Sequence, residues 1–162
     1  MTKIAALTLS CLAAAMPAAA AQHQLTAAEA RVIVAPLYEA LNEPTKKDVP
    51  ALLARATNPD YHSCSTETDC LNRSELAAQI RAFGEIIPDL HWRVLDLWVA
   101  GDRIIVLGQA TGRPTKTFFG VEPTGKGFTT IALDSFGVTN GKLSSAYHIE
   151  NWVAAIAQVR NR

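Results

Sequence analysis

An acidic residue, Asp134, lies within a segment whose pattern predicts a largely buried β-strand. The segment, residues 128–138, is followed by Asn140-Gly141, a pair typical of two-residue hairpin turns. A carboxylate in such a strand is costly unless it is paired, protonated or open to a polar pocket, and perturbed acids concentrate at functional sites. Asp134 is therefore predicted to be functional, the alternative being an Asp at a sheet edge satisfied by backbone or water. Because side chains alternate along a strand, Asp134 shares its face with apolar residues: Phe128, Ala132, Phe136 and Val138.

The first 21 residues are predicted to be a secretory signal peptide. Lys3 precedes an apolar stretch, residues 4–15, and Pro17 and the alanines 18–21 then offer small-residue cleavage sites. The rest of the chain, residues 22–162, is expected to be exported to the periplasm or secreted. No later apolar run in the sequence is long enough to span a bilayer.

The charge balance argues against polyanionic partners. The chain has 15 basic and 15 acidic residues, so loss of Lys3 leaves 14 − 15 = −1 with neutral histidines. Without a basic excess, neither nucleic acid nor an anionic membrane surface is an expected partner. The length of residues 22–162 favours a single domain with its own core.

Two cysteines are predicted to form a disulfide. Cys64 and Cys70 bracket a short polar segment, whereas Cys11 lies in the predicted signal peptide. In an oxidising compartment such a pair is most simply a disulfide, and closing so small a loop stabilises by about 2 kcal/mol in the chain-entropy model. A zinc site that adds His62 is the alternative, but it lacks a fourth ligand and the usual short cysteine spacing. No metal site is therefore predicted.

Helix signals fill the first half of the sequence and strand signals the second. Thr26 with Glu29, and Asn72 with Glu75, form capping boxes before apolar residues at helical spacing, and Asp48 can cap a short helix between them. Helices followed by antiparallel strands predict an α+β domain with helices on one face of a curved sheet. The expected helices cover residues 26–41, 48–53 and 72–87, the expected strands residues 90–99, 103–111, 128–138 and 142–151, and a short helix follows.

The partner of Asp134 across the last hairpin depends on the turn. A two-residue Asn140-Gly141 turn places Tyr147 directly opposite Asp134. A three-residue loop with a bulge places Ala146 opposite and His148 diagonally. The two registers are exclusive, because a slip of one residue moves every side chain to the other face. His148 and Glu150 share one face of their strand, either as a charge-balanced pair or as an outward polar face.

Several short motifs occur in order along the chain: Ile87-Pro88-Asp89-Leu90, Gly101-Asp102-Arg103, Ala110-Thr111-Gly112, Phe118-Phe119-Gly120-Val121-Glu122-Pro123-Thr124-Gly125, Asp134 and Gly141-Lys142-Leu143. In these motifs and their order, the sequence resembles the SnoaL-like polyketide cyclase or ester cyclase family of the nuclear transport factor 2-like superfamily. The resemblance implies a cone-shaped α+β barrel in which a curved antiparallel sheet wraps around the N-terminal helices and encloses one apolar pocket. It also implies that an Asp in the second-last strand acts as general acid/base in an intramolecular aldol ring closure, without metal or organic cofactor. Asp134 occupies that position.

The predicted function is cofactor-independent acid/base chemistry of cyclase, isomerase or hydrolase type on a small hydrophobic carbonyl compound. Asp134 would move a proton next to the carbonyl, and Tyr147 or His148 would stabilise the enolate. The alternative is a non-catalytic module that binds a small molecule or peptide, because one fold hosts both kinds of protein. The residues predicted to bind the substrate are Trp92, Tyr38, Phe136, Phe118 and, at the rim, His62.

The outer face of the sheet predicts self-association. Ile131 and Leu133 alternate with the face of Asp134, and the neighbouring strand adds either Ile105 and Leu107 or Ile104 and Val106, according to register. An exposed apolar patch of that size is unusual on a monomer, and a two-fold axis buries the same patch on both copies. A homodimer through the sheet face is therefore expected.

Overall fold

Helices and strands alternate in the first half of the chain, and the second half is mainly strand. The computed structural model describes residues 24–160, so the predicted signal peptide lies outside the described residues. The elements are α1 (Ala27–Leu41), the short 3-10 helix η1 (Pro44–Lys46), α2 (Val49–Ala56), β1 (Thr57–Cys64), β2 (Cys70–Asn72), α3 (Arg73–Ile86), β3 (His91–Ala100), β4 (Arg103–Gly112), β5 (Phe128–Thr139), β6 (Lys142–Glu150) and α4 (Trp152–Arg160).

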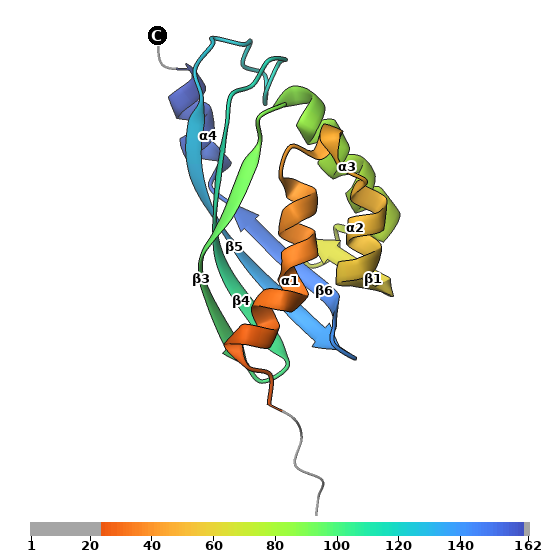
Figure 1. Cartoon of the computed structure of the whole chain (residues 1–162). Helices are drawn as coiled ribbons and strands as arrows, with labels where there is room; N and C mark the ends of the chain where they lie inside the picture. The colour runs from red at the N-terminus through yellow and green to blue at the C-terminus, as the bar shows by residue number, and fades with distance from the viewer. Residues whose placement is uncertain (1–23, 161–162) are drawn as a thin grey trace, which may run out of the picture.

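One curved six-stranded sheet, in the order β2-β1-β6-β5-β4-β3, holds the domain together. The helices α1, α2 and α3 cover one side of it, and α4 packs against β5 (Figure 1). The core lies between this helical layer and the inner face of the sheet. The α+β fold, with the sheet curved around the N-terminal helices, is confirmed. No helix within residues 24–160 has the length and apolar character needed to cross a membrane.

Local signals set the helix starts. The Thr26–Glu29 and Asn72–Glu75 capping boxes are both formed, and the Asp48 side chain accepts a hydrogen bond from Ala51 N at the start of α2. Each cap supplies acceptors for backbone N–H groups that have no partner within the helix. These three helix starts were predictable because capping involves residues only a few positions apart.

No strand was predicted in the first half of the chain, but residues 57–64 and 70–72 form β1 and β2 on either side of the polar segment 65–69. β1 pairs with β6 in parallel, so the sheet is mixed rather than wholly antiparallel. β1 carries Pro59 and several polar side chains, and only Thr57, Tyr61 and Cys64 are buried. The strand depends on pairing with a segment about 80 residues away, which local sequence patterns do not reveal. The predicted Cys64–Cys70 disulfide is present and joins β1 to β2.

The last hairpin combines a tight turn with a bulge. Thr139 pairs with Lys142 across Asn140-Gly141, as the two-residue turn predicts, but the register shifts between Gly137 and Val138 and places His148 directly opposite Asp134. Gly137 lies at this bulge, where a Cβ would come within 2.6 Å of the Ser145 hydroxyl, so a larger residue would force the serine side chain to move. Neither predicted register was correct, since each assumed a single offset along the whole hairpin.

Candidate functional site

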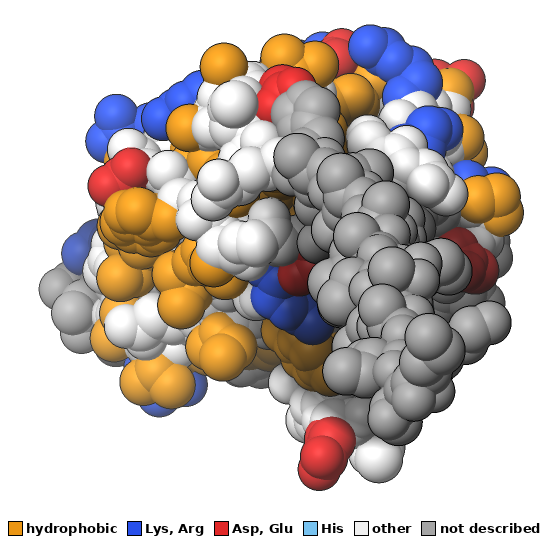
Figure 2. Space-filling view, turned by 90° about the horizontal axis from the view of Figure 1, so that it is seen from below, with side chains coloured by type: hydrophobic (Ala, Val, Ile, Leu, Met, Phe, Trp, Pro, Cys, Tyr) orange, Lys and Arg blue, Asp and Glu red, His pale blue; other side chains and the backbone are white. Residues whose placement is uncertain are grey.

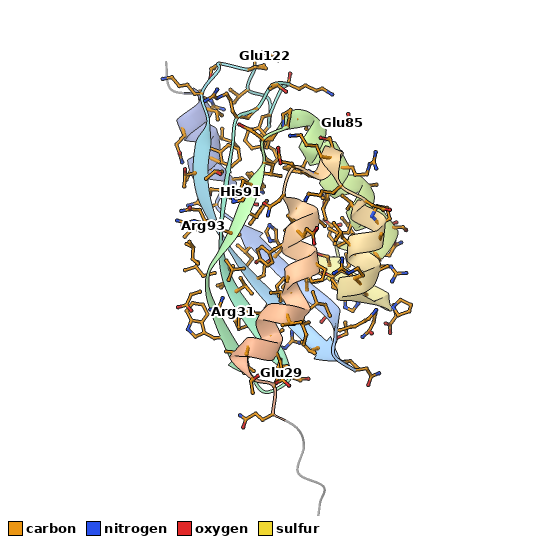
Figure 3. The ribbon with its side chains drawn as sticks, in the orientation of Figure 1. Glu29, Arg31, Glu85, His91, Arg93 and Glu122 are labelled. Carbon is orange, nitrogen blue, oxygen red and sulfur yellow. A yellow bond between two sulfur atoms is a disulfide. The ribbon has the colours of Figure 1, made fainter. Side chains whose placement is uncertain are left out.

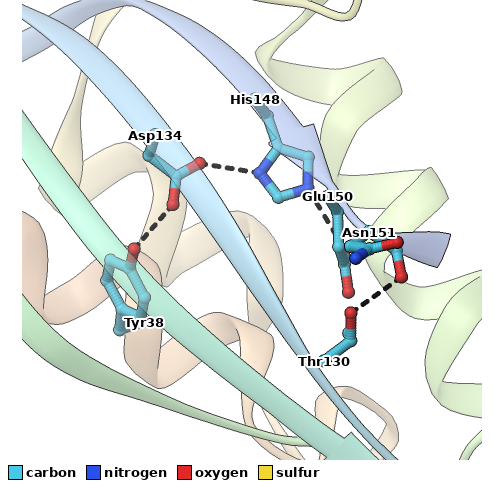
Figure 4. A network of polar contacts seen from close by, with 6 residues as sticks. All are labelled: Tyr38, Thr130, Asp134, His148, Glu150 and Asn151. Carbon is cyan, nitrogen blue, oxygen red and sulfur yellow. Dashed lines mark hydrogen bonds and ion pairs between the residues drawn. The ribbon is translucent and has the colours of Figure 1, made fainter. Parts of the chain in front are cut away.

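Asp134 projects from the inner face of β5 into the space between sheet and helices. Its alternation with exposed Ile131 and Leu133 is as predicted, and only 6% of the residue is accessible. Both carboxylate oxygens have partners (Figure 4). The Tyr38 hydroxyl of α1 donates to Oδ2 at 2.7 Å, and His148 Nδ1 of β6 lies 2.7 Å from Oδ1. Two hydrogen-bonding side chains, Tyr38 and His148, therefore hold the buried carboxylate in a fixed orientation.

His148 links two carboxylates. Its second ring nitrogen, Nε2, lies 3.2 Å from Glu150 Oε2, so the imidazole bridges Asp134 and Glu150. An ionised carboxylate only accepts hydrogen bonds, so both ring nitrogens donate when the two acids are charged. Burial by itself would lower the pKa of His148, but the hydrogen bonds and charges of Asp134 and Glu150 outweigh it and raise this pKa to about 10. His148 is therefore an imidazolium at neutral pH.

Two further pKa shifts shape the site. Burial, with the adjacent Asp134 charge and hydrogen bond, raises the pKa of Tyr38 far above its ordinary value, so Tyr38 stays a neutral donor. Burial also raises the pKa of Glu150 above its ordinary value, while the hydrogen bond and charge of His148 counteract this. Figure 4 shows the resulting chain from Tyr38 through Asp134 and His148 to Glu150, with Thr130 and Asn151 beside its end.

The His148 interactions predict a pH-dependent stability. The folded pKa of about 10 exceeds the ordinary 6.5, so the contribution is fully present below about pH 6.5 and is lost as pH rises towards 10. Urea unfolding from pH 6 to 10 should show a loss of stability that His148→Gln reduces. Parallel pH profiles for the two proteins would contradict the assignment.

The network lies in the wall of a cavity of about 460 Å³, a volume typical of small-molecule sites. Most of the lining is apolar or aromatic, and α1, β1, α3, β3, β5, β6 and α4 all contribute to it. The lining residues are Leu37, Leu41, Tyr61, Ser63, Cys64, Ser65, Asp69, Leu71, Leu76, Gln79, Ile80, Phe83, Leu90, Trp92, Asp134, Phe136, Ala146, His148, Glu150 and Trp152.

The structure brings together most of the predicted site residues. Asp134, His148, Trp92 and Phe136 line the cavity, and Tyr38 contacts it through its hydrogen bond to Asp134. The cavity-lining residues that sequence patterns missed include Tyr61, whose strand was not predicted, and Trp152 and Phe83, whose rings lie 5.5 Å apart. Glu150 also lines the cavity, and the sequence signal for it was that it lies two residues after His148 on the same face of the strand.

Three predicted site residues lie elsewhere. Tyr147 pairs with Ser135 on the outer face of the sheet, so the prediction that it faces Asp134 was wrong; the bulge between Gly137 and Val138 is the reason. His62 is exposed and alternates with the cavity-lining Tyr61 and Ser63, so it does not lie in the lining. Phe118 is buried in an aromatic cluster, stacked on Phe128, and is also absent from the lining.

Charged residues outside the network lie at the periphery. Figure 3 shows Glu85 and Glu122 at one end of the molecule, and Arg93 on the sheet side away from the helices. Arg93 pairs with Gln109 of the neighbouring strand, which accounts for its position. Among residues 24–160, no group of three or more His, Cys, Asp or Glu side chains is arranged to hold a metal ion.

Comparison with known proteins identifies the family of this chain. A family model described as SnoaL-like polyketide cyclase matches residues 35–159, whereas no curated protein sequence matches the chain significantly. Among solved structures, TsrD from Streptomyces laurentii is 21% identical with a TM-score of 0.72, covering 84% of this chain and 98% of that chain. A SnoaL-like protein from Jannaschia sp. CCS1 is 17% identical with a TM-score of 0.71, covering 83% and 94%. IdmH from Streptomyces antibioticus, for which polyketide cyclase activity has been proposed, is 26% identical with a TM-score of 0.67, covering 78% and 95%. The chain therefore belongs to the SnoaL-like polyketide cyclase family.

Proposed function

We propose that the protein is a cofactor-independent acid/base catalyst, of cyclase, isomerase or hydrolase type, that acts on a small hydrophobic carbonyl compound. The observation that carries this proposal is a buried carboxylate, Asp134, in the wall of a mainly apolar cavity, with one oxygen held by Tyr38 and the other by His148. A general base needs a fixed position within reach of the proton it removes. The family membership supports the same class of chemistry.

In this mechanism Asp134 takes a proton from the carbon next to the substrate carbonyl, and the electrons move to the carbonyl oxygen. The proton later returns from Asp134 to carbon or to oxygen, so the protein is unchanged. His148 does not offer a free N–H, because both ring nitrogens are engaged with carboxylates. Its positive charge nevertheless stabilises the negative charge that develops beside it.

Trp92 supplies the donor for the carbonyl oxygen in this proposal. Its indole Nε1 is buried, has no hydrogen-bond partner among residues 24–160, and belongs to a side chain that lines the cavity. The Trp92 and His148 ring centroids are 5.8 Å apart, so an oxygen bound to Trp92 Nε1 would lie near the imidazolium. A buried donor without a partner is costly, and a substrate oxygen relieves that cost.

One observation favours the second candidate, a non-catalytic binding module. Both Asp134 oxygens are already engaged by donors, which also suits a fixed charge that only orients a ligand. Native mass spectrometry and a substrate panel separate the two functions. An empty protein that turns over activated esters, enones or epoxides supports catalysis. A stoichiometric retained ligand with no turnover supports binding and contradicts the catalytic proposal.

We propose that the protein forms a homodimer through the outer face of the sheet. In Figure 2 hydrophobic side chains gather on the left of the molecule, the side on which the sheet lies. Ile104 and Val106 are buried and Ile105 and Leu107 are half-buried, so the second predicted set faces inward and the first outward. The exposed apolar side chains of this face are Leu95, Trp98, Ile131, Leu133, Tyr147 and Ile149.

The dimer proposal predicts a light-scattering mass of two chains at micromolar concentration. Ile149→Glu, which places a charge at a position 69% exposed on this face, should convert the protein to a monomer, because the charge loses water on association. Val32→Glu, on α1 and also well exposed, is the matched control and should remain dimeric. A wild-type mass of one chain would reject the dimer.

We also propose that the protein is exported. The Cys64–Cys70 disulfide supports this, because disulfides persist mainly in oxidising compartments. Cell fractionation of the full-length protein should find a processed chain outside the cytoplasm, whereas an unprocessed cytoplasmic chain would contradict export.

A further inference from the structure

Glu150 has one carboxylate oxygen that the protein itself does not satisfy. It ends β6, two residues after His148, and its side chain is only 1% exposed. Oε2 lies 3.2 Å from His148 Nε2, whereas Oε1 is buried and has no hydrogen-bond partner within the described part of the chain. The side chain lines the same cavity as Asp134. The terminal torsion of a glutamate is broad, so Oε1 can change direction without moving the rest of the side chain.

The charges around the cavity are mostly negative. The lining includes three acids, Asp69, Asp134 and Glu150, but His148 is its one cationic group, and no Lys or Arg occurs among the described residues that form it. Asp69 is exposed and accepts a hydrogen bond from Ser65 at the rim. Deeper in the cavity, His148 is the one basic side chain beside two buried carboxyl groups, those of Asp134 and Glu150.

Such a cavity disfavours anions. A ligand carboxylate or phosphate would lie beside two acidic side chains and only one basic side chain in a mainly apolar cavity, where like charges repel strongly. A ligand with a hydroxyl or ammonium group would instead donate to Glu150 Oε1. That contact satisfies a buried acceptor whose isolation is costly, and hydrogen bonds to charged groups are stronger than neutral ones.

We propose that Glu150 is the specificity residue of the cavity, and that it selects a neutral or cationic hydrophobic molecule bearing a hydrogen-bond donor, hydroxyl or ammonium, for Oε1. This proposal adds the substrate class to the proposed function. It rests on the proposed function in one respect, because both place the ligand in the same cavity. The donor group lies at the β6–α4 end of the cavity, next to Trp152, which follows Glu150 after one residue and also lines the space. Asp134 acts at a different point of the ligand, on the far side of His148.

Calorimetric titration with matched naphthalene probes at pH 7 tests this selection. The probes are 2-naphthalenemethanol, 2-naphthylmethylamine, 2-methylnaphthalene and 2-naphthoate, which share one ring system. The alcohol and the amine should each bind about tenfold or more tightly than the naphthoate, as expected for one charge-assisted hydrogen bond in place of a repulsion. The methyl compound should bind more weakly than the alcohol.

Three variants test whether Glu150 causes these binding preferences. Glu150→Gln keeps the shape and removes the charge, so the advantage of the amine over the naphthoate should fall below threefold. Glu150→Met removes the acceptor and should abolish the advantage of the alcohol over the methyl compound. Asp69→Asn removes the rim charge and should leave both preferences near wild type. Circular dichroism confirms that each variant is folded.

Several outcomes would overturn the proposal. They are wild-type binding of naphthoate as tight as that of the amine, an unchanged ranking in Glu150→Gln, an equal loss of preference in Asp69→Asn, and binding of none of the probes. The ranking of the probes is measured by binding alone, without turnover. If Asp134 is not the catalytic base, the ranking is still expected. If the ranking fails, the expected effect of Asp134→Asn on turnover is not affected.

Discussion

Asp134→Asn is expected to lower kcat/KM by roughly 10²- to 10⁴-fold on any substrate that the wild type turns over, the usual contribution of a positioned general base. Asparagine has nearly the same shape but cannot accept a proton at neutral pH. The change also removes the charged partner of the Tyr38 hydroxyl and His148 Nδ1. The free energy of unfolding should therefore fall by about 1–3 kcal/mol, the range for a lost buried hydrogen bond. Steady-state kinetics and urea unfolding measure the two effects.

Two matched variants accompany this change. Asp60→Asn makes the same substitution at an exposed position of β1 and should leave both turnover and stability near wild type. Tyr38→Phe removes one donor to Asp134 while keeping the ring, so turnover should fall less than in Asp134→Asn. Turnover by Asp134→Asn within a few-fold of wild type would rule out the acid/base role.

Phe118→Ala is expected to lower the free energy of unfolding by about 3–5 kcal/mol, the range for deleting a buried aromatic ring. Phe118 is 2% exposed, stacks on Phe128 with centroids 5.6 Å apart, and meets Trp152 edge-on at 5.5 Å. It thereby fixes the loop between β4 and β5, whose backbone also pairs Phe118 with Val121. Denaturant unfolding monitored by tryptophan fluorescence measures the change.

Phe119, the residue next to Phe118, provides the control. Phe119 also contacts Trp152 but is 52% exposed, so Phe119→Ala should cost less than about 1 kcal/mol. At a temperature where Phe118→Ala remains folded, its KM should stay near wild type, because Phe118 is not among the described residues that line the cavity. A large rise in KM with little loss of stability would restore the substrate-binding role that the sequence suggested.

Features that depend on nearby residues were predictable from the sequence. Capping boxes set the starts of α1 and α3, and side-chain alternation placed Asp134 on the buried face of β5. The disulfide followed from the spacing of two cysteines and the expected compartment. In each case the physical cause acts over a few positions in the chain.

Features that depend on distant segments of the chain could not be predicted from the sequence. β1 exists because β6 and β2 pair with it, and its own residues resemble a polar loop. At the bulge beside Gly137, the hydroxyls of Ser144 and Ser145 lie close to where a Cβ would be, and the resulting register places His148 rather than Tyr147 opposite Asp134. The free oxygen of Glu150 follows from tertiary packing around β6, so no sequence pattern predicts it.

The most direct test of the central claim is the exchange of protons next to a carbonyl in D2O. 2-Tetralone is a compact hydrophobic ketone of a size suited to a cavity of about 460 Å³, and proton NMR follows the loss of its α-proton signals. If Asp134 removes a proton from the carbon next to the carbonyl, the wild type accelerates exchange above the buffer rate, Asp60→Asn behaves like the wild type, and Asp134→Asn returns to the buffer rate. Equal exchange rates with wild type and Asp134→Asn, or wild-type exchange at the buffer rate, would contradict the account.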